Sequence, residues 1–427
     1  MPSQAPFWIP WNDVMVEIVN RLLECPDRRS RGRRALSARC PEQNALRNSH
    51  GASAEAAGLY VHVPVCRSKC RYCGFYSVPA AGRDTGRVVR ALLQELDRYA
   101  GTAFHTAYVG GGSPTALPAE QLIALARRIR EHSMRIDEFT VECNPGQVEF
   151  GLLAGLRRAG VNRLSFGAQS FRGAELELLG RGHCVEDIRR SVELARRAGF
   201  DNVGLDLIFA IPGSTLGDWQ YSVEAAIDLG VEHVSAYGLS FEAGTTFDAW
   251  RREGRISHVD EDLDRAMYEW AIERLDAAGL VQYEISNFAW PGHECMHNLG
   301  YWENRPFVGI GPGAASYRDG CRTTNDADIE RYVAAVESGL EAPGEVQPVT
   351  DDDAVCETAV LNLRMRAGID LGKFHRRTGW DAMQIFAGPI QRHRDLGLIE
   401  VTDRAVRLTR QALPIADTIL CDFAALE

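Results

Sequence analysis

From Leu59 onward, short apolar segments alternate with longer segments in which apolar residues recur every three or four positions. The short segments have the length and composition of strands, and the long ones have the periodicity of helices that bury one face. Strands that alternate with helices are typical of a parallel sheet, because each helix returns the chain to the same edge. We therefore expect an α/β fold, either doubly wound or partly closed as a barrel. The predicted strands are Leu59–Val63, Ala107–Val109, Glu138–Glu142, Arg163–Phe166, Asn202–Ile208 and His233–Tyr237, and the helices between them are Val88–Tyr99, Ala119–His132, Phe150–Ala159, Val185–Ala198 and Trp219–Leu229.

After this alternating region the pattern changes. A long helical pattern over Glu261–Ala278 precedes a loop-rich stretch from Tyr283 to Arg322, and the segment from Gly339 to Pro348 has the glycines and prolines of a linker. We expect this linker to separate a barrel domain over residues 58–338 from a small C-terminal domain over residues 350–427. Helices followed by a hairpin indicate a winged-helix-like domain there. Its predicted helices are Ala354–Met365, Leu371–Thr378 and Ala382–Leu396, and its hairpin pairs Leu398–Val401 with Ala405–Leu408.

Residues 1–57 differ from the rest of the chain. They contain eight Arg against six Asp or Glu, including a basic run at residues 28–34 that has no apolar periodicity. An amphipathic piece from Trp11 to Leu23 precedes this run. A mitochondrial transit peptide would be poorer in acidic residues. We expect residues 1–57 to form a poorly ordered N-terminal extension.

Composition and charge limit the classes of partner. The chain has 427 residues, of which 45% are hydrophobic and 25% are charged, as in an ordinary globular protein. No apolar run approaches the ~18 residues needed to span a bilayer. A net charge of -11 argues against a nucleic-acid partner, also for the winged-helix-like domain. Eleven cysteines, an odd number without a secretory signal, indicate a reducing compartment and hence a cytoplasmic protein.

The most informative residues are Cys66, Cys70 and Cys73, which follow the first predicted strand with C-x3-C-x2-C spacing. Three thiolates on one loop can hold a [4Fe-4S] cluster and leave one iron open to a small-molecule ligand. The alternative is a structural zinc ion held by the three thiolates and His62, since Cys3His is a common zinc set. Zinc sites usually combine two separated ligand pairs, and no second pair follows here. The spacing therefore favours the cluster.

Polar residues follow the next predicted strands. A glycine-rich turn, Gly110-Gly-Gly-Ser-Pro, comes after the second strand, and Glu142, Gln169 and Asp206 lie at or near the ends of the third, fourth and fifth. Carboxylates can hold an ammonium group or ribose hydroxyls, and Arg181 can pair with a carboxylate. Each residue taken alone is better explained as an ordinary polar residue than as a ligand contact. Together they suit an amino-acid nucleoside at the carboxyl ends of the strands.

These motifs resemble those of radical S-adenosylmethionine proteins, in particular the oxygen-independent coproporphyrinogen III oxidase-like group. The resemblance extends from about Leu59 to the C-terminus and implies a partial (β/α)6 barrel with a small C-terminal domain. It also implies that Cys66, Cys70 and Cys73 ligate a [4Fe-4S] cluster whose open iron is chelated by S-adenosylmethionine. The motifs are Tyr60-Val-His-Val-Pro-Val-Cys-x3-Cys-x2-Cys, Gly110-Gly-Gly-Ser-Pro, Val141-Glu-Cys-Asn-Pro, Ser165-Phe-Gly-Ala-Gln-Ser and Asp206-Leu-Ile-Phe-Ala-Ile-Pro-Gly, and the positions that match S-adenosylmethionine contacts are Tyr60, Gly111, Gly112, Glu142, Gln169, Arg181 and Asp206.

Two branches of this group differ just after the third cysteine. The oxidase branch carries a further cysteine where this chain has Phe75, so the chain is more similar to the haem chaperone branch. That branch usually has Cys-Asp-Phe at this point, whereas this chain has Gly74, as the oxidases do.

The segment His297-Asn-Leu-Gly-Tyr-Trp is similar to a motif that the chaperone branch associates with haem binding. A neutral imidazole is a common axial ligand of haem iron, and Tyr301 and Trp302 could offer flat apolar surface to a porphyrin. His293 and Cys295 are alternative ligands nearby, and we select His297. The structural alternative is a loop held by a hydrogen-bonded histidine and a buried tryptophan.

The resemblance implies a protein that holds haem, a cluster and S-adenosylmethionine and passes haem to a membrane-associated haem protein such as a respiratory oxidase. The rival function is oxidative decarboxylation of coproporphyrinogen by a 5'-deoxyadenosyl radical. A third is radical chemistry on an unrelated substrate. The sequence leaves a monomer and a homodimer both open.

Overall fold

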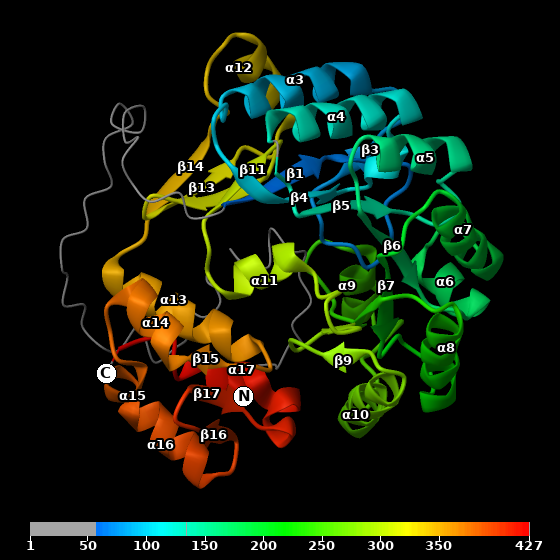
Figure 1. Ribbon diagram of the computed structural model, residues 1–427. Coiled ribbons are helices and arrows are strands. Elements are labelled where there is room, and N and C mark those ends of the chain that lie inside the picture. Colours follow the sequence, from blue (N-terminus) through cyan, green and yellow to red (C-terminus); the bar gives the residue numbers. More distant parts are fainter. Residues whose placement is uncertain (1–56, 134, 427) are drawn as a thin grey trace.

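The computed structural model describes residues 57–133 and 135–426 (Figure 1). Apart from Ala57, the N-terminal extension predicted over residues 1–57, with its amphipathic piece, lies outside these residues. None of the described helices combines the length and the apolar character needed to cross a bilayer.

Six parallel strands form the centre of the fold and are hydrogen-bonded in chain order. All six were predicted from the sequence, and helices connect them over the outer face of the sheet (Figure 1). The prediction of a partial (β/α)6 barrel is therefore confirmed. The strands are β1 (Ala57–Val63), β4 (Phe104–Gly111), β5 (Glu138–Cys143), β6 (Arg163–Gln169), β7 (Val203–Phe209) and β8 (His233–Gly238), and the helices are α3 (Thr85–Asp97), α4 (Ala119–His132), α5 (Phe150–Arg158), α6 (Gly173–Leu179), α7 (Val185–Arg197) and α8 (Leu216–Asp228).

The two faces of these strands have opposite characters, because successive side chains point to opposite sides. Residues such as Leu59, Val61 and Val109 are fully buried in the main apolar core with the helices. The residues between them, such as Tyr60 and Tyr108, lie on the inner face. Further polar inner-face residues are His62, Thr106, Glu138, Glu142, Arg163, Ser165, Asp206, His233 and Ser235.

The stretch from Tyr283 to Arg322, predicted to be loop-rich, contains four short strands and a helix that lies inside the ring of elements in Figure 1. Together with one strand before it and one after it, these strands extend the described sheet to twelve strands. Strands of two to five residues at the sheet edges carry too few alternating positions to be recognised from the sequence. The elements are β9 (Val281–Gln282), β10 (Asn287–Ala289), α11 (Met296–Trp302), β11 (Phe307–Ile310), β12 (Ala315–Arg318), β13 (Cys321–Asn325) and β14 (Gly344–Pro348).

The linker predicted from Gly339 to Pro348 was wrong for its second half. Residues 344–348 form β14, which pairs antiparallel with β13 along its whole length. Every residue of β14 is exposed, so it carries no apolar alternation. Proline is tolerated in such an edge strand, where one row of backbone groups faces solvent.

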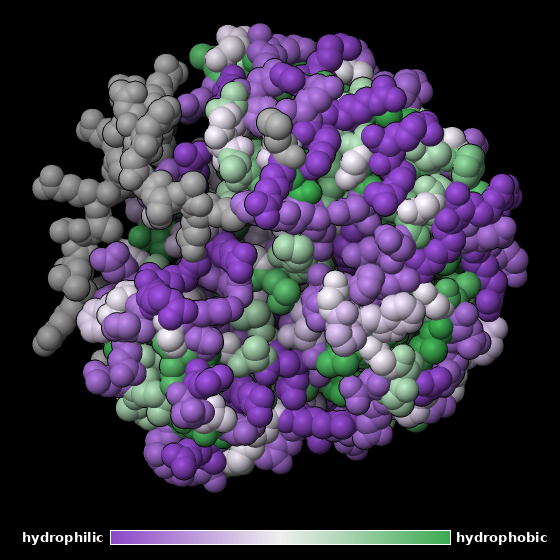
Figure 2. Space-filling view, in the orientation of Figure 1, coloured by the Kyte–Doolittle hydropathy of each residue, from purple (hydrophilic) through white to green (hydrophobic). Residues whose placement is uncertain are grey.

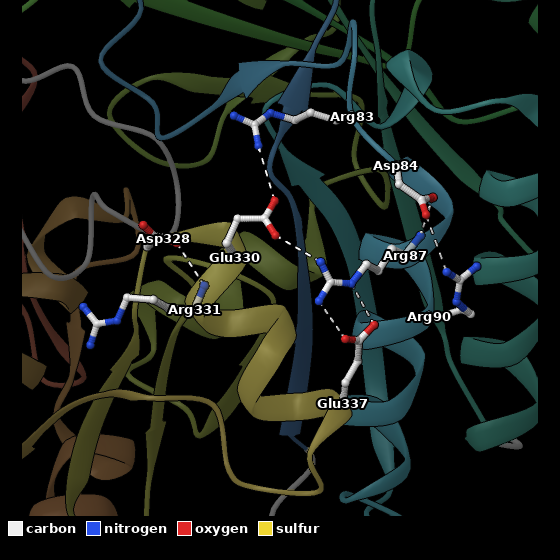
Figure 3. Close-up of polar contacts among 8 residues, drawn as sticks. All are labelled: Arg83, Asp84, Arg87, Arg90, Asp328, Glu330, Arg331 and Glu337. Carbon is white, nitrogen blue, oxygen red and sulfur yellow. Dashed lines mark hydrogen bonds and ion pairs between the residues drawn. The ribbon is translucent and has the colours of Figure 1, made fainter.

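Helix α12 (Ile329–Glu337) fixes this extension to α3. On the exposed side of α12, Glu330 and Glu337 pair with Arg87 of α3, at 3.1 Å and 2.8 Å respectively (Figure 3). Exposed ion pairs contribute little to stability. The buried side carries more of the contact, since the Tyr332 hydroxyl donates to the buried Glu95 carboxylate at 2.5 Å.

The C-terminal domain packs against α11 and contains the predicted hairpin, to which a short third strand is added. The helix predicted over Ala382–Leu396 is divided at Phe386. Proline at position 389 has no N–H to donate to the carbonyl of Ile385, which interrupts the helix. The elements are α13 (Asp351–Arg364), β15 (Ile369–Asp370), α14 (Leu371–Thr378), α15 (Ala382–Ile385), α16 (Ala387–Asp395), β16 (Ile399–Val401), β17 (Ala405–Leu408) and α17 (Ala416–Cys421), and the longer connections before them include α9 (Thr246–Arg252) and α10 (Glu261–Ala277).

The face of the molecule shown in Figure 2 is mostly hydrophilic, and hydrophobic residues appear there in small separate groups. Scattered apolar residues of this kind are normal on a protein surface.

Candidate functional site

A cavity lies at the carboxyl ends of the parallel strands. Its volume is about 1200 Å³, counted with the part that is open to solvent. It brings together all the residues predicted to bind the cluster and S-adenosylmethionine except Tyr60. Those lining it are Cys66, Cys70, Cys73, Gly111, Gly112, Glu142, Gln169, Arg181 and Asp206.

The cysteine loop is anchored through Arg71, which lies between the second and third cysteines. Its backbone N–H donates to the Leu179 carbonyl at 3.0 Å, and its guanidinium donates to the Glu177 carbonyl at 2.7 Å, both at the end of α6. Its own carbonyl accepts the Phe247 N–H of α9 at 2.9 Å, and the guanidinium lies 5.3 Å from the ring centre of Trp250. The loop is therefore held from both sides.

The three thiols fit an iron–sulfur cluster better than zinc. Burial raises the pKa of Cys73 to about 12 and also raises the pKa of Cys66, so metal binding would displace thiol protons. Within the described part of the chain, no three His, Cys, Asp or Glu side chains are grouped to hold a single metal ion. The His62 ring contacts the Tyr60 hydroxyl and the Tyr76 carbonyl, each at 3.1 Å, and does not line the cavity. The alternative Cys3His zinc site is therefore not supported, whereas a cubane spreads its ligands over several irons.

The glycine-rich turn lies directly against the end of β1. Gly111 has a φ of 104°, and a Cβ on it would lie 2.7 Å from His62 Nδ1. A Cβ on Gly112 would lie 2.7 Å from the Val65 carbonyl oxygen. Only glycine fits this close approach, which places the turn beside the cysteine loop.

Two half-buried carboxyls line the same cavity. Glu142 accepts a hydrogen bond from the Tyr108 hydroxyl at 2.8 Å, and burial raises its pKa to about 7. Asp206 accepts from the Ser235 hydroxyl at 2.8 Å, and burial also raises its pKa. Both are acceptors that a ligand ammonium or ribose hydroxyl could use.

Gln169 and Arg181 complete the polar set. Gln169 ends β6 with a φ of 68°, which is unusual for a residue other than glycine, and its buried Oε1 has no hydrogen-bond partner. Arg181 donates to the Gly167 carbonyl at 2.7 Å and to the Asn144 side chain. A strained backbone and an unsatisfied buried oxygen in a cavity are typical of a ligand site. These acceptors, Arg181 and the three thiols of the cysteine loop lie in a single cavity and fit S-adenosylmethionine beside a cluster.

Tyr60 is the exception among these predicted residues. Its hydroxyl contacts His62 Nδ1, its ring lies 6.2 Å from that of Tyr108, and it does not line the cavity. Tyr60 therefore packs beneath the site, and its contact with a ligand stays a prediction.

His297 lies on α11, inside the barrel and away from the cluster cavity. Its Nδ1 contacts the Thr106 hydroxyl at 2.8 Å, and its Nε2 contacts the Tyr301 hydroxyl at 2.9 Å. The side chain is 3% exposed, and burial lowers its pKa to about 3, which keeps the imidazole neutral. The contacts match the structural alternative, and coordination of haem iron would require the ring to give up one of them. The axial role of His297 stays a prediction.

A second pocket borders His297 near the amino ends of β1 and β4, where Gly58 and Thr106 line it. Beside this pocket, α11 is fixed by the inner-face residue Glu138. Its carboxylate accepts the N–H groups of Met296 at 2.8 Å and of His297 at 3.0 Å. An acceptor at a helix N-terminus satisfies N–H groups that have no partner within the helix.

Sequence reasoning missed several residues that line the cluster cavity. Asn144 was part of a quoted motif but was not selected. Glu284 belongs to the stretch predicted as loop, and Arg364 comes from the C-terminal domain. For Arg364, the sequence offered only an arginine inside a predicted helix, and nothing in it linked that position to the cysteine loop. The structure shows that this arginine is buried in α13.

Comparison with known proteins agrees with this geometry. Residues 60–226 match the model of the Radical SAM superfamily, and residues 349–415 match the HemN C-terminal domain. The curated protein "Heme chaperone HemW" of Bacillus subtilis is 35% identical over 371 residues, which cover 85% of this chain and 98% of the relative. HemW of Escherichia coli is 38% identical over 263 residues, covering 60% of this chain and 68% of the relative.

The solved structure of coproporphyrinogen III oxidase (HemN) from Escherichia coli, described as a radical SAM enzyme, has the same fold. It superposes with a TM-score of 0.75 at 22% identity, covering 86% of this chain and 90% of the other. The family implies a [4Fe-4S] cluster and S-adenosylmethionine, which the three thiols and the polar set of the cavity fit. The predicted resemblance is confirmed, and the chain belongs to the HemW family of radical S-adenosylmethionine proteins.

Proposed function

We propose that this protein is a haem chaperone that binds haem together with the cluster and S-adenosylmethionine and passes the haem to a recipient haem protein. The relatives that share about a third of its residues carry the name haem chaperone. The observation that carries the proposal on this chain is Phe75, which lines the cluster cavity where the oxidase branch has a further cysteine. A phenylalanine there offers apolar surface and no thiol.

The chain's own residues would supply the binding set. Cys66, Cys70 and Cys73 would hold the cluster, whose chemistry is one-electron reduction of S-adenosylmethionine. The polar set would orient that ligand: Glu142 and Asp206 would accept from its ammonium and ribose groups, and the guanidinium of Arg181 would pair with its carboxylate. By this proposal the recipient is a membrane-associated haem protein, and the chaperone works in the cytoplasm.

A second function, oxygen-independent coproporphyrinogen III oxidation, is favoured by Gly74, which matches the oxidases. The residues predicted to bind S-adenosylmethionine gather in one cavity beside the cysteine loop. Such a site would suit either role.

One experiment separates the two functions. The cluster is reconstituted anaerobically, and haem binding by absorbance is measured beside coproporphyrinogen decarboxylation. We expect haem binding with little decarboxylation. Robust decarboxylation without haem binding would reject the chaperone.

A further inference from the structure

The cluster cavity has a second wall that none of the S-adenosylmethionine positions explains. It consists of Glu284 and Ser286 between β9 and β10, Trp302 at the end of α11, and Arg364 at the end of α13. A β-bridge between Glu284 and Met365 joins the barrel to the C-terminal domain at this point. The wall therefore exists only where the two parts of the chain meet.

Arg364 is a buried cation held in a fixed position. It is 5% exposed, and its guanidinium lies 4.9 Å from the ring centre of Trp302. Its Nη1 lies 3.5 Å from an Asp417 carboxylate oxygen. A guanidinium has several N–H donors in a planar fork, so this ion pair is compatible with a second carboxylate. Stacking on an aromatic face limits the movement of the side chain before a ligand arrives.

Glu284 is fully buried beside this cation. One oxygen accepts the Ser286 N–H at 3.0 Å and the side-chain amide of Asn287, and the other, Oε2, has no hydrogen-bond partner. Burial raises the pKa of Glu284, and the neighbouring Arg364 guanidinium opposes this rise. An unsatisfied buried carboxyl oxygen in a cavity wall indicates a place for a ligand's polar group.

Helix geometry separates the two ends of the motif that includes His297 and Trp302. Five positions along an α-helix correspond to a rotation of about 140°, so the two side chains leave different faces. Trp302 lines the cluster cavity, whereas His297 lines the second pocket. The position of His297 alone therefore does not show which of the two cavities would hold a ligand that the whole motif recognises.

We propose that this wall holds the carboxylate end of the haem, with Arg364 pairing with a propionate. The inference rests on the proposed haem-binding function and places the porphyrin in the cluster cavity rather than in the pocket beside His297. Three carboxyls line this cavity, so an anionic ligand needs a matching cation there. Arg181 is already assigned to the carboxylate of S-adenosylmethionine, and Lys69 is bonded to the Phe75 carbonyl. Arg364 is the cation at the opposite wall.

The test is a comparison of haem with haem dimethyl ester, in which both propionates are blocked. The full chain carries a reconstituted cluster and is titrated by absorbance as wild type, Arg364→Gln, His297→Ala and the control Arg366→Gln. Arg366 lies two residues away, outside the cavity lining, and donates to the Leu408 carbonyl. Affinity for S-adenosylmethionine and cluster absorbance are measured for every variant.

We expect Arg364→Gln to weaken haem binding by about tenfold or more, because a buried carboxylate loses its charged partner. Binding of the ester, S-adenosylmethionine affinity and cluster absorbance should not change, and Arg366→Gln should behave as wild type. The wild type should bind the ester more weakly than haem, a result that does not depend on whether the variant folds.

Each of the following outcomes would overturn the inference. Unchanged haem affinity in Arg364→Gln rejects the site alone. Equal affinity of the wild type for haem and its ester also rejects it. Loss of haem binding in His297→Ala, together with no loss of haem binding in Arg364→Gln, rejects it as well. A wild type that binds no haem rejects the proposed function itself, and the site with it.

Discussion

Arg181 donates a hydrogen bond from Nη1 to the sulfur of Cys70 at 3.3 Å. The same guanidinium reaches the end of β6 through the Gly167 carbonyl at 2.7 Å. A residue predicted to bind S-adenosylmethionine therefore also contacts a predicted cluster ligand. Hydrogen bonds to cluster sulfurs are one of the ways in which a protein sets a cluster's reduction potential.

We predict that Arg181→Gln weakens S-adenosylmethionine binding by about tenfold or more and lowers the cluster's reduction potential. The potential should fall because a cation and an N–H donor near the sulfur both stabilise the more negative, reduced cluster. Equilibrium dialysis and a redox titration followed by electron paramagnetic resonance measure the two effects. Arg190→Gln, at an exposed position of α7, is the control. A potential equal to that of the wild type would show that the contact with Cys70 is not kept when the cluster is present.

We predict that S-adenosylmethionine affinity decreases as the pH falls below about 7. Burial raises the pKa of Glu142 to about 7, so the carboxylate needed to attract a ligand cation becomes neutral below that pH. The loss should approach about tenfold for each pH unit, as expected for one linked proton. Binding titrations between about pH 8 and about pH 6 measure it, and Glu142→Gln should give a weaker, flat profile. A sloping profile in that variant would assign the proton to another group.

Loss of one cysteine ligand should remove the cluster without unfolding the chain. In Cys70→Ala we expect the iron content and the cluster absorbance to fall to near background, because two thiolates do not hold a cubane. The thermal transition of the apo protein should remain close to that of the wild type, since Cys70 is only partly buried. Cys184→Ala, at an exposed position before α7, is the matched control. Retention of four irons per chain in Cys70→Ala would refute the three-thiolate site.

Arg71 gives a prediction about how long the cluster lasts. Arg71→Ala keeps all three thiols but removes the guanidinium contacts to α6 and to Trp250, so the loop should lose its cluster faster. The rate of bleaching in the presence of a chelator should rise by about tenfold. Arg255 also stacks on Trp250, at 4.3 Å, and pairs with Glu253 rather than with the loop. Equal bleaching rates in Arg71→Ala and Arg255→Ala would show that the α6 contacts do not stabilise the loop.

The sequence predicts the centre of this fold better than its edges. Strands β1 and β4 to β8 were recognisable because their buried faces carry runs such as Leu59, Val61 and Val63, packed against long periodic helices. Strand β14 was not, because all five of its residues are exposed and its pairing with β13 is made by backbone groups. Backbone pairing leaves little trace in side-chain identity.

The candidate site shows the same division. The cluster end was predictable, since the cysteines, the glycine turn and Glu142 lie in recognisable motifs that the strands carry to one edge. The second wall was not, because Glu284 and Arg364 are eighty positions apart and meet only through the bridge at Met365. The position of His297 also depended on the tertiary structure, since only the fold decides which face of α11 meets Thr106.

The opposite characters of the two strand faces have a consequence for how such a protein can change during evolution. The packing that stabilises the barrel lies on the outer face, among residues such as Leu59 and Val109, whereas the predicted ligand contacts on the strands lie on the inner face. A replacement on the inner face alters what is bound and removes little apolar packing. An ancestral barrel of this kind could therefore exchange a catalytic task for a transport task through few substitutions, without first acquiring additional stability.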